Sequence, residues 1–206
     1  MPHYKLIYFN VRGRAELSRL ILHCANVPFE DFRVEHSEWP ALKNGMPFKQ
    51  IPVLEIDGDK MLAQSNSIAR YLALHHGLAG SNDWEQSQAD MFIDCVYDLH
   101  AGMRPIAREK DPEKQKEVFR AVNQEMIQPH AKRIEQHLNQ KDSGFLVGNA
   151  VTWADIAYFA YFTTPIMENL GAQVLDDHPK LKKLVQHVGE IPSIKKYIET
   201  RPVTTR

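Results

Sequence analysis

Tyr8 is the first residue of the chain whose type and position suggest chemistry. It lies near the end of the short β-prone run Leu6–Phe9, just before a turn that contains Gly13 and the start of a helical pattern. In α/β units, ligands bind beyond the carboxyl ends of strands, where a phenol could donate a hydrogen bond to an anion and Arg14 could add positive potential. The alternative is a half-buried packing tyrosine, which its position alone favours.

Two further places could bind carboxylates. Gln64 and Ser65 stand at a predicted helix N-terminus, where free N–H groups and the helix macrodipole attract an anion. Trp39 and Lys43 lie one helical turn apart, so an indole N–H and an ammonium could meet a second carboxylate. The ordinary alternatives are a capping serine without a ligand and a solvated helix face with a packed tryptophan.

The dipeptide Ile51-Pro52 could bind the middle of an extended ligand. It precedes a predicted strand and is a candidate cis peptide, although an ordinary trans loop is the alternative. A backbone turned in this way can pair with a peptide-like ligand. Taken together, these sites fit a small extended molecule with a carboxylate at each end and an ionisable group near Tyr8, which is the shape of glutathione.

The first eighty residues alternate the strand and helix signals that would position these side chains. Asn26-Val27-Pro28 ends the first helical pattern, and Asp57-Gly58 is a hairpin turn. The expected elements, in chain order, are the strand Leu6–Phe9, a helix containing Leu17, Leu20, Ile21 and Cys24, a strand at Phe32 and Val34, a short helix from Ser37-Glu38-Trp39-Pro40, the strands Val53–Ile56 and Lys60–Ala63, and a helix capped by Ser65 that ends at Gly77. This β-α-β-α-β-β-α order is the arrangement of the thioredoxin-like fold, here without a C-x-x-C motif.

After a linker near residues 78–83 the pattern becomes helical throughout. Thr152 and Asp155 form a variant of the capping box before the apolar segment Ala154–Phe162, which we expect at the core of this domain. Pro129 lies inside a helical stretch and should kink or interrupt it. An apolar face on the first of these helices comprises Phe92, Val96, Leu99 and Met103, and an acidic ladder comprises Asp90, Asp94 and Asp98.

The sequence therefore predicts an α/β thioredoxin-like domain over residues 1–80 and an all-α domain over residues 83–206. The formal net charge of −1 disfavours a nucleic-acid partner, and no apolar segment is long enough for membrane insertion. Cys24 and Cys95 are too far apart for a C-x-x-C redox or zinc pair and too few for a disulfide framework, which favours a cytoplasmic location. No metal ligand set is expected.

Several motifs are weak alone but specific as a set. They are Tyr4-Lys5-Leu6, Tyr8-Phe9-Asn10, Arg12-Gly13-Arg14-Ala15-Glu16, Trp39-Pro40, Pro47-Phe48, Gln50-Ile51-Pro52-Val53-Leu54, Gln64-Ser65, Ile68-Ala69-Arg70-Tyr71-Leu72, Gly148–Asp155 and Arg201-Pro202. Together they closely resemble a sigma-class glutathione transferase over nearly the whole chain, a class that includes mammalian haematopoietic prostaglandin D synthases and invertebrate enzymes.

The resemblance implies a role for each matching residue. Tyr8 would be the catalytic tyrosine, with Arg14 as its electrostatic helper, and Asp98 would reach the glutathione amino group of the partner subunit in a homodimer. The remaining glutathione contacts would be Trp39 and Lys43 at the glycyl carboxylate, Gln50, Ile51 and Pro52 at the cysteinyl part, and Gln64 and Ser65 at the γ-glutamyl end.

The resemblance also implies the reaction. Glutathione would be the co-substrate, and its thiolate would attack small hydrophobic electrophiles in an apolar cleft between the domains, lined in part by Val11 and Met103. Detoxification, hydroperoxide reduction and prostaglandin isomerisation are the expected activities, and a non-catalytic ligand carrier or crystallin-like structural protein is the alternative.

Three departures from the prostaglandin synthases concern the second substrate and the glutathione domain. The tryptophan of their substrate pocket has no counterpart near Arg104-Pro105-Ile106, and Tyr97-Asp98 replaces two adjacent aspartates linked to activation by divalent metal. Lys49 stands where relatives often have glycine.

Overall fold

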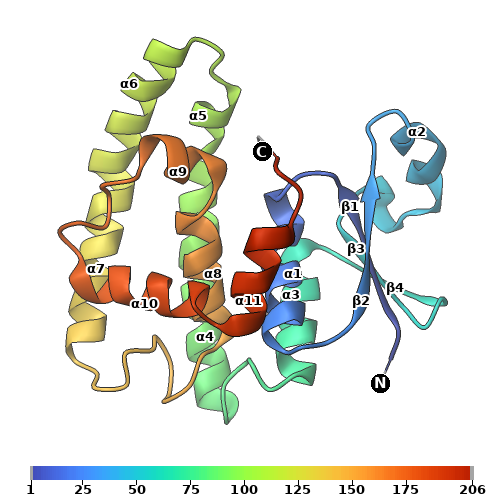
Figure 1. Cartoon of the computed structure of the whole chain (residues 1–206), viewed down its shortest axis with the longest axis horizontal. Helices are drawn as coiled ribbons and strands as arrows, with labels where there is room; N and C mark the ends of the chain where they lie inside the picture. Colours follow the sequence, from blue (N-terminus) through green and yellow to red (C-terminus); the bar gives the residue numbers. More distant parts are fainter. Residues whose placement is uncertain (1, 205–206) are drawn as a thin grey trace. The chain divides into compact units, whose positions relative to one another are not determined.

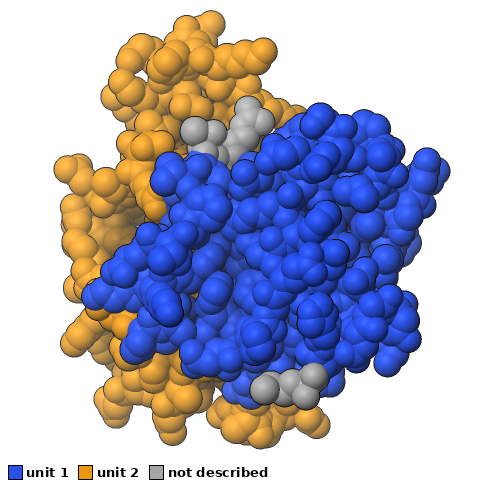
Figure 2. All heavy atoms as spheres, turned by 45° about the vertical axis from the view of Figure 1, so that its right-hand side comes forward, with its two compact units in different colours: residues 1–78, 191–206 blue, residues 79–190 orange. Residues whose placement is uncertain are grey.

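The computed structural model describes residues 2–204, which form two compact units (Figures 1 and 2). The first unit runs to Leu78 and resumes at Ile191, and residues 79–190 form the second unit. The sequence prediction placed the chain after Ile191 in the helical domain. The structure differs there because helix α11 packs against helix α1 of the first unit.

The first unit contains a four-stranded mixed sheet in the order β2-β1-β3-β4. Strand β1 pairs in parallel with β2 and antiparallel with β3, and β3 and β4 form the predicted hairpin. Asp57 and Gly58 make its turn with φ angles of 54° and 80°, as an Asp-Gly hairpin turn requires. The strands are β1 (Tyr4–Phe9), β2 (Phe29–Val34), β3 (Val53–Ile56) and β4 (Lys60–Ala63).

Side chains alternate across this sheet, so its two faces carry different helices. In Figure 1, α1, α3 and α11 lie on one side of the sheet and α2 lies on the other. Ile7, Val34 and Val53 form a buried cluster against which Trp39 and Leu42 of α2 pack. The helical elements of this unit are η1 (Gly13–Ala15), α1 (Glu16–Cys24), α2 (Trp39–Leu42), η2 (Lys43–Gly45), η3 (Pro47–Lys49), α3 (Ser65–His75) and α11 (Pro192–Thr200).

The predicted cap of α3 is wrong by one residue. Gln64, with φ 73° and ψ 117°, occupies the N-cap, and Ser65 is the first helical residue. The element order of the first eighty residues is otherwise the one that the sequence predicts, and the α/β thioredoxin-like fold followed by a helical region is confirmed.

The second unit is built from helices packed around α8, whose residues are almost all buried. The predicted apolar face of α4 is also buried, with Phe92, Val96, Leu99 and Met103 each at most 5% exposed. Within residues 2–204, no helix is both long and apolar enough to cross a membrane. The elements are α4 (Asp83–Gly102), α5 (Arg104–Arg108), α6 (Pro112–Val122), η4 (Asn123–Ile127), α7 (Gln128–Asn139), α8 (Trp153–Phe162), α9 (Pro165–Leu170) and α10 (Pro179–Gly189).

Pro129 interrupts its helix as expected, and the interruption is a π-helical turn. The turn, η4, joins α6 to α7 directly before the proline, and the Gln128 N–H donates to the Asn123 carbonyl five residues back. Proline has no N–H for the helical hydrogen-bond ladder, so the regular pattern cannot pass unchanged through this position. One wide turn lets the helix continue beyond it.

Two buried carboxylates cap helices of the second unit. Asp155 accepts hydrogen bonds from the Leu146 N–H at 2.9 Å, the Thr152 N–H at 2.7 Å and the Thr152 hydroxyl at 2.9 Å, which confirms the predicted capping box. Glu135 of α7 accepts the N–H groups of Lys180 and Leu181 at the start of α10. Both carboxylates satisfy backbone donors that burial would otherwise leave unpaired.

Candidate active site

Tyr8, Pro52 and Gln64, three of the predicted site residues, lie at the same end of the strands in the first unit. Ile7 pairs with Val53, and Val53 pairs with Ala63. Tyr8 follows the first of these residues, Pro52 precedes the second and Gln64 follows the third. The strand register therefore brings the end of β1, the start of β3 and the end of β4 together.

The Tyr8 hydroxyl lies beneath the start of the first helical segment. Its oxygen accepts a hydrogen bond from the Arg14 N–H at 3.3 Å, and the residue is 8% exposed. No described residue accepts the hydroxyl proton, which leaves it available for an anion. The structure places the exposed residue Arg14 next to Tyr8 through its backbone.

Gly13 makes the close approach of this turn to the phenol possible. Its φ is +43°, and a Cβ at this position would lie 2.9 Å from the Tyr8 hydroxyl oxygen and 3.0 Å from a ring carbon. A larger residue would therefore meet both backbone strain and a clash. The turn is predictable from the sequence, but this contact is not.

Arg19 supports the turn after β1, although no motif in the sequence singles it out. It is fully buried, and its guanidinium donates to the carbonyls of Val11 and Arg12 at 2.8 and 3.2 Å and to Asp31 at 2.9 Å. Its guanidinium carbon lies 6.0 Å from the centroid of the Tyr8 ring. Arg19 thus holds the turn after β1 in place, and the charged pair Glu16 and Arg19, three residues apart on an apolar helix, was the available signal.

A second buried interaction fixes the start of α1. Glu16 accepts hydrogen bonds from the Tyr197 hydroxyl at 3.1 Å and from Arg201 at 2.7 Å, in addition to its ion pair with Arg19. Burial, followed by the nearby Glu16 carboxylate, raises the pKa of the Tyr197 phenol. Tyr197 and Arg201 follow Ile191, which explains why this part of the chain belongs to the first unit.

The residues predicted to bind the glycyl carboxylate lie on the other face of the sheet. Trp39 opens α2, is half-buried and packs edge-on against Phe9, with ring centroids 5.7 Å apart. Lys43 opens η2 and is exposed. Phe9 is the neighbour of Tyr8, so this aromatic contact ties the Trp39 segment to the same end of β1.

The remaining predicted contacts of this unit lie around β3 and α3. Gln50 is exposed, the Ile51-Pro52 peptide is cis, and Ser65 is buried. Gln64 is a non-glycine residue at positive φ, a conformation that is costly and is retained mostly at functional sites.

Lys49 has a φ of 51°, a left-handed backbone conformation that glycine adopts at less cost than lysine.

Asp98 belongs to the second unit, where it is exposed on α4. The carboxylate opposes the effect of burial on His130, whose pKa is lowered to about 4 by desolvation and then by Arg133. The ladder residue Asp94 is likewise exposed.

The donor set of the first unit fits an extended ligand with two carboxylates. It offers a phenol hydroxyl, an exposed ammonium, two exposed glutamine side chains and the N-terminus of α3, and it places no carboxylate among the predicted contacts. These groups can hold an anionic peptide and stabilise a thiolate at Tyr8.

Two family models match the chain. Residues 4–74 match the family described as "Glutathione S-transferase, N-terminal domain", and residues 97–201 match "Glutathione S-transferase, C-terminal domain". The chain belongs to the glutathione S-transferase family.

Its relatives include both transferases and prostaglandin synthases. The chain is 42% identical to "Glutathione S-transferase 1" of Ascaris suum over 210 residues and 38% identical to human "Hematopoietic prostaglandin D synthase" over 206 residues, with 99% of each chain covered in both comparisons. Among solved structures, "monomeric Na-GST-3" of Necator americanus is 37% identical, with a TM-score of 0.87, and the match covers 99% of this chain and 100% of that one. These findings confirm the resemblance predicted from the motifs.

Proposed function

We propose that this glutathione S-transferase activates the glutathione thiol through the Tyr8 hydroxyl for attack on small hydrophobic electrophiles. The observation that carries the proposal is the hydroxyl itself, which accepts a hydrogen bond from the Arg14 N–H and keeps its own proton for an anion. Family membership supplies glutathione as the co-substrate.

One hydrogen bond of this kind has a suitable magnitude. A thiol with a pKa near ~8.5 is only a few per cent ionised at neutral pH, and lowering that pKa by about 2 units needs about 2.7 kcal/mol of preferential thiolate stabilisation. A hydrogen bond to a charged group contributes about 1.5–3 kcal/mol. In this proposal Tyr8 donates to the thiolate, Arg14 orients the hydroxyl, and the carbon–sulfur bond forms as the leaving group or electrophilic π-bond takes the electron pair.

The proposed glutathione contacts divide by function. Trp39 and Lys43 bind the glycyl carboxylate, and Gln64 and Ser65 bind the γ-glutamyl end. Gln50, Ile51 and Pro52 contact the cysteinyl part. Support comes from the exposure of Lys43, Gln50 and Gln64, from the N-terminus of α3 and from the positive φ of Gln64.

The second substrate is proposed from the relatives. Those named transferases support conjugation of electrophiles, and those named hematopoietic prostaglandin D synthase support isomerisation of a prostaglandin endoperoxide. Assaying one preparation with aromatic halides, unsaturated aldehydes, hydroperoxides and the endoperoxide separates these activities. Bound glutathione without turnover on any of them would favour the carrier or structural alternative.

The role of Tyr8 is tested by removing one oxygen atom. Tyr8→Phe should lower the conjugation rate at neutral pH by about 25-fold, because raising the thiol pKa from about 6.5 to about 8.5 reduces the thiolate from roughly three quarters to roughly 3% of the bound glutathione. Glutathione affinity should stay within about twofold, since the carboxylate contacts remain.

The thiolate absorbance of the bound complex, measured against pH, reports the thiol pKa directly. Tyr4→Phe is the matched control, because it removes a hydroxyl from a buried tyrosine on the same strand. An unchanged thiol pKa in Tyr8→Phe would overturn the assignment.

We further propose a homodimer in which Asp98 binds the glutathione amino group of the partner subunit. The support is chemical, because Asp98 is an exposed carboxylate on the second unit, while the other proposed contacts belong to the first. A charge-assisted hydrogen bond to the amine contributes about 1.5–3 kcal/mol, so Asp98→Ala should weaken glutathione binding about tenfold or more. Sedimentation should give twice the chain mass, and a monomer with full activity would reject the proposal.

Mixing Tyr8→Phe and Asp98→Ala chains tests the arrangement across subunits. If Asp98 serves the partner, one site of the heterodimer carries both lesions and the other carries neither, so wild-type affinity and rate return at one site. If Asp98 serves its own chain, each site carries one lesion and no such recovery occurs.

We also propose a cytoplasmic location, supported by the free thiols of Cys24 and Cys95. Fractionation of cells that express the protein would test it.

A further inference from the structure

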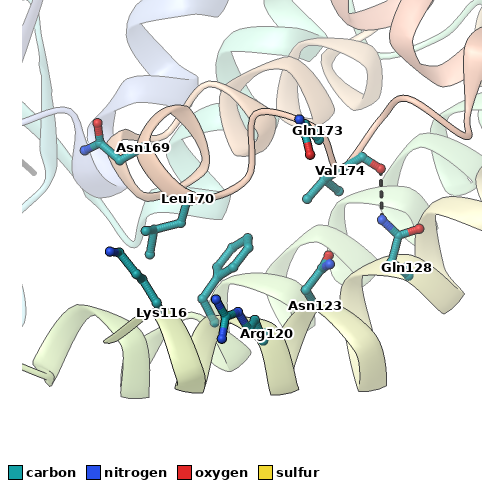
Figure 3. A pocket seen from close by; sticks show the side chains of 9 residues that line it. Lys116, Arg120, Asn123, Gln128, Asn169, Leu170, Gln173 and Val174 are labelled. Atoms are coloured by element: carbon teal, nitrogen blue, oxygen red, sulfur yellow. Dashed lines mark hydrogen bonds between the residues drawn. The ribbon is translucent and has the colours of Figure 1, made fainter. Parts of the chain in front are cut away.

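A pocket in the second unit lies between α6 with the π-helical turn on one side and α9 with the segment that follows it on the other (Figure 3). Its volume is about 420 Å³. Lys116, Arg120 and Asn123 come from the first wall, and Leu170 and Val174 come from the opposite wall. None of the proposed glutathione contacts lines this pocket.

The charged side chains that line the pocket are positive. The pocket contains two cations, Lys116 and Arg120, one helical turn apart, and none of the described residues that line it is acidic. Lys116 pairs with the carboxylate of Glu113 at 2.8 Å, and Glu113 is 81% exposed. An exposed pair of this kind is weak, so a ligand anion can replace Glu113 at little cost.

Asn123 gives the pocket an unused acceptor. Its side-chain oxygen is buried and has no hydrogen-bond partner among the described residues. An unpaired buried acceptor is costly, and a native protein that retains one usually satisfies it with water or a ligand. The residue opens the π-helical turn, a type of irregularity that is frequent at functional sites.

The two walls are held together independently of any ligand. The Gln128 amide donates to the Val174 carbonyl at 3.0 Å, and its oxygen contacts a ring nitrogen of His178 at 2.8 Å. Phe119 and Val174 are buried and supply apolar surface inside the pocket. A pre-formed cavity with an apolar lining and a few polar groups is the usual form of a small-molecule site.

We propose that this pocket is a second ligand site, separate from the glutathione site, for a small aromatic carboxylate that also carries a hydrogen-bond donor. The carboxylate binds Arg120 and Lys116, the ring packs against Phe119, Leu170 and Val174, and the donor satisfies the oxygen of Asn123. The inference does not depend on the role of Tyr8.

The probe is 4-hydroxyphenylacetate, which has the ring, the carboxylate and the donor. Binding is measured by calorimetry and by amide NMR shifts, with S-methylglutathione present to occupy the proposed glutathione site. Shifts should concentrate on residues of α6, η4 and α9. The neutral 4-hydroxyphenylacetamide should bind about tenfold or more weakly, and phenylacetate, which lacks the donor, about fivefold more weakly.

Variants separate charge at the pocket from charge elsewhere on the same helix. Arg120→Gln should weaken binding about tenfold or more. Lys114→Gln, which removes an exposed cation of α6 outside the pocket lining, should change the affinity by less than about twofold. Equal effects of the two variants would show that the probe binds by non-specific charge attraction, and the proposed site would be rejected.

Asn123→Leu provides a readout that a structural role would not produce. It should weaken the probe about fivefold, whereas thermal stability should stay equal or rise because an unpaired buried oxygen is removed. The proposal fails if the probe does not bind at millimolar concentration, if S-methylglutathione displaces it, or if Asn123→Leu leaves its affinity unchanged.

Discussion

Tyr8 in the first unit and Asp155 in the second are both buried polar groups, but their hydrogen-bonding capacity is used differently. Asp155 is fully buried and accepts three hydrogen bonds from its own chain. Tyr8 accepts one and keeps its proton uncommitted among the described residues. A polar group whose hydrogen bonds are completed internally stabilises the fold, whereas one left with an unused donor can act on a substrate.

The largest effect should come from removing Asp155, whose carboxylate makes its hydrogen bonds within the chain. Asp155→Ala leaves buried N–H donors of Leu146 and Thr152 unpaired, so unfolding should become easier by about 3 kcal/mol or more. Urea denaturation measures this loss. The exposed N-cap Asp111 is the matched control, because it accepts two backbone hydrogen bonds and Asp111→Ala should cost only about 1 kcal/mol. Equal costs would show that burial does not set the value of a cap.

The second effect depends on pH. His130 has a pKa lowered to about 4 and lies 2.7 Å from the Tyr158 hydroxyl, so the unfolded chain binds a proton at higher pH than the folded chain. Its contribution to stability is complete above about pH 6.5 and is lost as pH falls toward 4, by up to about 3 kcal/mol. Unfolding free energies from pH 7.5 to 4.5 should fall less steeply in His130→Gln. Parallel curves for the two proteins would show that protonation of His130 does not cause the pH dependence.

The third effect concerns catalysis. Gly13→Ala should lower the conjugation rate about tenfold or more, because the new Cβ displaces the Tyr8 hydroxyl. Gly77→Ala is the control, since Gly77 has a φ of +72° with nothing within 4 Å of an added Cβ. Loss of rate in both variants would trace the effect to backbone strain rather than to the contact with Tyr8.

The smallest effect refines the capping box. Thr152→Ala removes one of the hydrogen bonds to Asp155 and the side-chain cap, which should cost about 1 kcal/mol of stability with glutathione conjugation unchanged. Thr152→Ser keeps the hydroxyl and should cost less. A loss of catalysis at wild-type thermal stability would contradict a purely structural role for this box.

Local sequence patterns predicted the features that neighbouring residues determine. The hairpin at Asp57-Gly58, the Thr152 and Asp155 box and the interruption at Pro129 each follow from residues a few positions apart. The fold class followed from the order of such elements.

Features that depend on distant contacts were not predictable in this way. Glu135 caps α10 from 45 residues away, and the burial of Arg19 depends on carbonyls and on Asp31 that only the folded chain assembles. The shift of the α3 cap from Ser65 to Gln64 depends on an unusual backbone conformation that no side-chain pattern announces.

The contact of α11 with α1 has a consequence for the order in which the chain matures on the ribosome. Glu16 is made 181 residues before Tyr197 and 185 residues before Arg201, its two later partners. Residues 79–190 are complete before either partner has been synthesised. The first unit is the first to be synthesised and the last to be completed, so the buried Glu16 lacks two of its partners until nearly the whole chain has been translated.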